Sequence, residues 1–157
     1  MTELSDFLFD KILAYDLVLV DVTEAPEPQV LRARVRRVYS SGKGIDSNFL
    51  DLEIEFVQAG RAWGNMILDV GDHAFLFVRR LASGLLHENF WHGHMIVEEI
   101  EGDLYAIFQH KEMWLNKNIP PLLRENSRPD PKRSHTTAVR FDVVESYLLS
   151  LIEKAGR

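Results

Sequence analysis

Cysteine is absent from this chain of 157 residues, and its absence excludes several kinds of chemistry. A protein without cysteine forms no disulfide, no thiolate zinc site and no cysteine nucleophile. Long apolar runs are missing too, since no stretch approaches the roughly 18 residues of a membrane-spanning helix. The opening residues, "MTELSDFLFDKILAYD", carry acids where a signal peptide has Lys or Arg. We therefore expect a cytoplasmic protein that does not enter a membrane.

The sequence motifs of common enzyme classes are missing as well. The stretch "SSGKGIDS" contains glycines and a lysine, but it lacks the spacing of a phosphate-binding Walker A loop. No serine lies in a G-x-S-x-G nucleophile elbow. The carboxylates of "EEIEGD", residues 98–103, are of a type that serves acid–base chemistry, yet the pattern is typical of a solvated hairpin tip. The sequence favours a protein that is not an enzyme and needs no cofactor.

Acidic residues outnumber basic ones, 24 against 18, which gives a net charge of −6. The excess is concentrated in residues 1–30, where seven acids accompany a single base, Lys11. An acidic protein is repelled by phosphate backbones unless it gathers basic residues on one face. It is attracted to basic partners. The charge therefore favours a basic protein partner and makes nucleic acid an improbable one.

Apolar residues at helical spacing predict a helix over residues 3–15. They are Leu4, Phe7, Leu8 and Ile12. The following stretch "LVLVDVT", residues 17–23, is rich in β-branched residues and apolar on both faces at first, which predicts a strand in the middle of a sheet. Its two prolines make "EAPEP", residues 24–28, a predicted turn.

Arginine alternates with apolar residues in "LRARVRRV", residues 31–38, and acids alternate with apolar residues in "FLDLEIEFV", residues 49–57. Each alternation predicts a strand with one charged face. We expect the two strands to pair as an antiparallel hairpin with arginines opposite carboxylates, each pair contributing about 0.2–1 kcal/mol. The residues concerned are Arg32, Arg34, Arg36, Asp51, Glu53 and Glu55. Arginines neutralised in this way release few phosphate counterions, which argues against a nucleic-acid grip.

The rest of the chain completes an α+β prediction. Further strands are expected in "AFLFV", residues 74–78, and in a hairpin that turns at Gly102. A second helix is expected from Asp142 to the chain's end. We predict a single domain, residues 1–157, with a mainly antiparallel sheet or a small OB-like barrel of six to seven strands, and a helix near each end. Residues 115–136 hold four prolines and predict a long loop, either functional or disordered.

Four successive stretches resemble the first strands of OB-type barrels. These are "YDLVLVDVTEA", "LRARVRRVY", "LDLEIEFV" and "VGDHAFLFV". The Gly-Asp turn before the last of them resembles the netrin/TIMP-like variant, and the likeness spans residues 15–78 and implies the fold alone. In size, acidity and lack of catalytic motifs the chain also resembles bacterial immunity proteins, which implies an inhibitor that neutralises a basic, toxin-like partner.

Our first hypothesis is therefore a non-enzymatic protein-binding module. Its predicted partner-binding residues are Asp6, Asp10, Asp16, Glu24, Glu27, Glu98, Glu99, Glu101, Asp103, Trp91 and Trp114. The alternative is a β-barrel, either a binding protein or an enzyme, that holds a metal ion or a small ligand. Its imidazole ligands would come from His87, His92 and His94 in "HENFWHGH". A third hypothesis is a barrel that binds single-stranded nucleic acid through Trp63, Trp91 and the basic loop 115–136.

Overall fold

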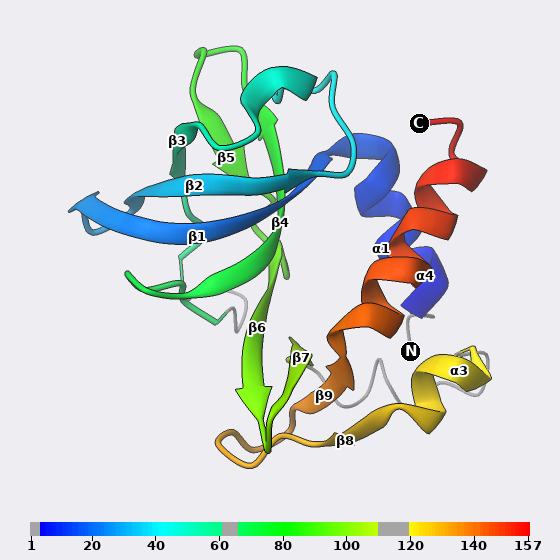
Figure 1. The fold of residues 1–157 in the computed structure, drawn as a ribbon. Helices are drawn as coiled ribbons and strands as arrows, with labels where there is room; N and C mark the ends of the chain where they lie inside the picture. Colours follow the sequence, from blue (N-terminus) through cyan, green and yellow to red (C-terminus); the bar gives the residue numbers. More distant parts are fainter. Residues whose placement is uncertain (1–3, 61–65, 110–119) are drawn as a thin grey trace.

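A computed structural model describes residues 4–60, 66–109 and 120–157 of the chain. The described part is an α+β domain in which strands predominate (Figure 1). Its strands are β1 (Asp16–Glu27), β2 (Val30–Val38), β3 (Glu53–Val57), β4 (His73–Arg80), β5 (Leu86–Glu88), β6 (His94–Ile100), β7 (Asp103–Phe108), β8 (Ser127–Pro129) and β9 (Thr137–Arg140). Its helices are α1 (Leu4–Ala14), the short 3-10 helix η1 (Ser47–Phe49), α3 (Pro121–Glu125) and α4 (Phe141–Lys154).

Five strands close into a small barrel. They follow the order β1-β2-β3-β5-β4, and β4 pairs back to β1. All of these pairings are antiparallel except the one between β3 and β5. From β4 the sheet continues outside the barrel through β6, β7, β9 and β8. The predicted small barrel with a helix near each end is confirmed, although the described part holds nine strands where the sequence predicted six or seven.

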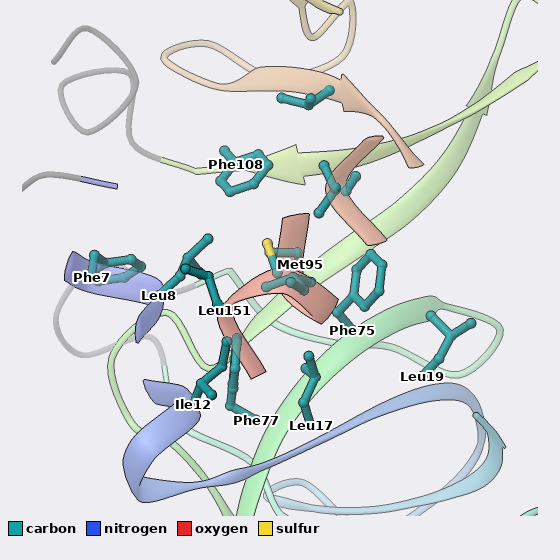
Figure 2. Close-up of a cluster of buried hydrophobic side chains, with 14 of the residues drawn as sticks. Phe7, Leu8, Ile12, Leu17, Leu19, Phe75, Phe77, Met95, Phe108 and Leu151 are labelled. Atoms are coloured by element: carbon teal, nitrogen blue, oxygen red, sulfur yellow. The ribbon is translucent and has the colours of Figure 1, made fainter. Parts of the chain in front are cut away.

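The strands β1 and β4 bury both of their faces, as their continuous apolar stretches predicted. One face of each points into the barrel, where Val18 and Val20 meet Leu76. The other face points outward to α1 and α4, which cover it. Figure 2 shows this outer cluster, in which α1 contributes Phe7, Leu8 and Ile12, β1 contributes Leu17 and Leu19, and β4 contributes Phe75 and Phe77. The two cores therefore share the same two strands.

The predicted hairpin of β2 and β3 is confirmed. In its register Arg32 lies opposite Glu55 and Arg34 lies opposite Glu53. The third arginine differs from the prediction, because Arg36 pairs with Asp21 on β1, at 2.5 Å. The apolar alternation also begins later than predicted, since β3 starts at Glu53 and the preceding Leu50 and Leu52 are exposed.

Two predicted irregular segments contain secondary structure. The strand β1 runs through Pro26 to Glu27, where a turn was predicted. Proline is tolerated there because β1 pairs with β4 only over residues 16–21, so its far end is an edge strand. The predicted loop 115–136 contains α3 and β8 within its described residues, 120–136. None of the helices in the described part is long and apolar enough to cross a membrane.

A buried ion pair joins the end of the chain to the first strand. Asp16 is fully buried, and its carboxylate accepts a hydrogen bond from Arg157 at 2.5 Å. The same carboxylate accepts bonds from the backbone N–H groups of Lys43 and Ile45, both at 2.8 Å. Arg157 also donates to the backbone oxygen of Ser41 at 2.7 Å. The predicted assignment of Asp16 to a partner-binding surface is therefore wrong, because its charge is used inside the fold.

We expect Asp16→Ala to lower the free energy of unfolding by about 3–5 kcal/mol, because it removes the carboxylate beside the largely buried guanidinium of Arg157 and the acceptor of two backbone N–H groups. The matched control is Asp103→Ala, which removes an exposed ion pair with Arg140 and should cost about 1 kcal/mol or less. Urea denaturation of both variants measures the difference. Equal losses in the two variants would contradict the structural role of Asp16.

Candidate functional site

The predicted partner-binding acids are scattered over three separate corners of the molecule. Asp10 lies on α1, Glu24 and Glu27 lie at the tip of the β1–β2 hairpin, and the acids of residues 98–103 lie around the β6–β7 hairpin (Figure 1). The first two corners are at opposite ends of the molecule. Asp6 belongs to α1, but its side chain is outside the described residues, as is Trp114. One contiguous acidic surface that contains all of these residues does not exist in the described part.

The acids of the β6–β7 hairpin are largely neutralised by the segment 128–140. Glu98 pairs with Arg133 at 2.5 Å, Glu101 pairs with Arg128 at 3.0 Å, and Asp103 lies 3.5 Å from Arg140. The hydrogen bond from Arg133 lowers the pKa of Glu98 below its ordinary value. Glu99 points outward and is exposed. The acidic residues 98–103 and the basic loop 115–136 were predicted as separate binding surfaces, but their charges pair with each other.

The acids at the β1–β2 tip are only partly neutralised. Glu24 and Glu55 both pair with Arg32, each at 2.9 Å, so one cation serves two carboxylates. Glu27 is exposed at the tip. This tip carries a local excess of negative charge on a protruding hairpin, but it contains no large apolar side chain that would anchor a partner.

The three histidines proposed as metal ligands are not brought together. The Nδ1 of His94 donates to the buried carboxylate of Glu88, while that of His87 contacts the backbone oxygen of Glu88 at 2.6 Å. His92 precedes β6 in a turn with φ of 49° and packs against Phe7. It therefore lies outside β6, whereas His94 is the first residue of that strand. Among the described residues, no three His, Asp or Glu side chains lie close enough to hold a metal ion.

A pocket of about 510 Å³ lies between α1 and the Asn89–Trp91 loop, which links β5 to β6. We call it the α1 pocket. It is lined by Phe7, Asp10, Lys11, Ala14, Tyr15, Asn89, Phe90 and Trp91. Phe90 is 60% exposed and Trp91 is 41% exposed, and we call this pair the aromatic rim. Of the predicted partner-binding residues, the structure brings Asp10 and Trp91 together here.

The Asn89–Trp91 loop is held close to the sheet by backbone contacts. The N–H of Asn89 donates to the carbonyl of Phe77 at 3.0 Å, and the N–H of Phe77 donates to the carbonyl of Gly93 at 2.8 Å. A Cβ added at Gly93 would lie 2.2 Å from the backbone oxygen of Asn89, so glycine is needed for this close approach. The loop is therefore fixed at both ends, and its aromatic rim is displayed in a defined position.

Lys11 ties the same loop to α1. Its ammonium donates to the Oδ1 of Asn89 at 3.0 Å and to the backbone oxygen of Trp91. The ammonium also lies 4.7 Å from the ring centre of Phe7 and 6.0 Å from that of Trp91, within cation–π range. Burial lowers the pKa of Lys11 from 10.5 to about 8, although the charge of Glu88 opposes the shift.

Sequence reasoning missed Lys11 and Phe90. The signal for Lys11 was present, because Lys11 lies four residues after Phe7 and directly before Ile12, within the apolar stripe of α1. A lysine in such a stripe is either a side chain that reaches past the core to water or a buried charge. Phe90 gave no signal, because its exposure depends on how the loop turns between two strands that are far from α1 in sequence.

Comparison of the chain with protein-family models, with curated proteins and with solved structures gave no match.

Lys11 predicts a specific dependence of stability on pH. Because its pKa is about 8 in the folded protein and 10.5 as a free side chain, the unfolded chain binds more protons between these values. The free energy of unfolding should therefore rise as the pH increases from 8 to 10.5, by about 3 kcal/mol at most. Below pH 8 both states are protonated and the contribution of Lys11 is constant.

Urea denaturation of the wild type and of Lys11→Met across this range isolates the effect, since other titrating groups cancel in the difference. The two curves of stability against pH should diverge between pH 8 and pH 10.5. Parallel curves would show that Lys11 is not buried as a charge.

Proposed function

We propose that this protein is a non-enzymatic binding module that docks on a basic protein, in the manner of an inhibitor or immunity-type protein. The observation that carries the proposal is the aromatic rim, Phe90 and Trp91, exposed beside the α1 pocket. Adjacent exposed aromatic residues at a pocket mark interaction sites, and Trp is among the residues that dominate binding energy at interfaces. The lack of cysteine supports a cytoplasmic location for the complex.

The charge of the protein supports a basic partner. Most described arginines are already paired with carboxylates of the same chain, as on the β2–β3 face and the β6–β7 hairpin. The net charge of −6 therefore reflects carboxylates that these arginines do not neutralise. Asp10 lies at the α1 pocket, next to the aromatic rim. An arginine of the partner would stack on Trp91 and pair with Asp10 in one contact.

The strand order and the single parallel pair support an OB-type assignment for the barrel. Barrels of that type bind nucleic acid over β2 and β3. In this chain Arg32 and Arg34 on that face lie opposite Glu55 and Glu53. We therefore do not extend the proposal to nucleic acid.

The first test is affinity capture from cells with the wild type, Phe90→Ala and Trp91→Ala as baits, followed by titration of the captured protein. We expect the wild type to capture a basic protein, and each variant to bind it about thirtyfold more weakly, as for a hot-spot residue. Leu104→Ala is the control, since Leu104 is 47% exposed at the start of β7, away from the pocket. Unchanged affinity of Trp91→Ala for the captured protein would refute the aromatic rim as the docking site.

The second test concerns electrostatic steering. Asp10→Lys should slow association with the same partner, because the new lysine at the α1 pocket repels a basic surface. The difference in association rate between the variant and the wild type should shrink at high salt. Glu99→Lys makes the same charge change on the β6–β7 hairpin and should have a smaller effect. Association rates measured by surface plasmon resonance at low and high salt compare the two. An equal slowing in both variants would mean that net charge acts without any local contact at α1.

A further inference from the structure

Lys11 is a buried cation that lacks a carboxylate partner among the described residues. Its side chain is 5% exposed, and no Asp or Glu of the described ranges lies within ion-pair distance of its ammonium. Glu88 acts on it through its charge, but the carboxylate of Glu88 is occupied by His94 and by the backbone N–H of Ala59 at 3.0 Å. Buried charges in proteins are normally paired, so this one indicates a place for an anion.

One of the three donors of the Lys11 ammonium has no hydrogen-bond partner among the described residues. An ammonium carries three N–H groups, and two of them point to the Oδ1 of Asn89 and the backbone oxygen of Trp91. Three aromatic rings surround it, with Phe77 at 5.9 Å in addition to Phe7 and Trp91. Burial removes water from this charge and lowers the pKa of Lys11.

We propose that the α1 pocket binds an organic carboxylate, with its apolar body against the aromatic rim and its carboxylate beside Lys11. The lining combines four aromatic side chains with this single buried cation, and its volume of about 510 Å³ suits a small molecule or one terminal residue of a peptide. The chemistry is shared by a free organic acid and by the C-terminal residue of a peptide. This inference does not rest on the proposed protein partner.

The charge balance of the pocket explains why the carboxylate carries the specificity. In a partly desolvated site an ion pair with Lys11 replaces an uncompensated charge, whereas a neutral amide leaves that charge as it was. Asp10 lines the same pocket and opposes an anion. Asp10→Asn should therefore raise the affinity for a carboxylate severalfold and leave the affinity for its amide unchanged.

The experiment uses 3-phenylpropionate and its neutral isostere 3-phenylpropionamide as probes, titrated into the wild type and followed by calorimetry. We expect the acid to bind at least tenfold more tightly than the amide. Lys11→Met should abolish this preference, while Lys154→Met should retain it. Lys154 is a matched control because its ammonium lies 5.0 Å from the ring centre of Phe9, outside the pocket.

A second measurement holds even where Lys11→Met fails to fold. The pKa of Lys11 in the wild type, followed by NMR of its ε-carbon, should rise on addition of 3-phenylpropionate and stay constant with the amide. Equal binding of acid and amide, no binding of either, or a pKa of Lys11 that ignores the acid would each overturn the proposal.

The source of the carboxylate is decided by a second probe pair, N-acetyl-alanyl-phenylalanine and its C-terminal amide. Binding of the free-acid peptide at least as tightly as 3-phenylpropionate, with loss in the amide, assigns the site to a peptide C-terminus. Exclusion of both peptides, with 3-phenylpropionate still bound, assigns it to a free organic acid. Either result supports a carboxylate site at Lys11. Neither depends on whether a protein docks on the aromatic rim.

Discussion

The burial of β1 and β4 on both faces is the constraint from which the rest of the structure follows. Their inner faces close the barrel, and their outer faces need a second apolar layer, which α1 and α4 supply. Phe77 on β4 faces that layer, and its backbone anchors both ends of the Asn89–Trp91 loop. Because α1 packs on the same outer face, Lys11 meets the loop directly above Phe77. The pocket is thus a consequence of how the two cores share two strands.

Charge in this protein has two roles that the structure separates. Across β2 and β3, and between the β6–β7 hairpin and segment 128–140, opposite charges pair with one another and fix the register and position of strands. At the α1 pocket the charges are not balanced in this way, since the ammonium of Lys11 is buried and Asp10 is exposed. A buried charge costs stability, and residues that cost stability tend to occur at functional sites. The pocket is therefore the part of the surface where we place binding.

Sequence periodicity was a good guide where contacts are local and a poor one where they are not. The arginine and glutamate alternation predicted the β2–β3 register because cross-strand pairs need only a period of two. It gave no sign of the parallel pair of β3 with the short β5, or that Arg133 returns to Glu98 from 35 positions along the chain. The closeness of His87, His92 and His94 in sequence was misleading, because a turn at His92 separates β5 from β6.

Lys11 lies inside an aromatic enclosure at the α1 pocket and does not extend into solvent. A ¹H–¹³C NMR spectrum of the wild type tests it most directly, because aromatic rings shift the resonances of protons held over their faces. We expect the ε-methylene protons of Lys11 to be shifted strongly upfield, with part of that shift lost in Trp91→Leu. Resonances at the position of a free lysine side chain, unchanged by Trp91→Leu, would place Lys11 in solvent and away from the aromatic rings.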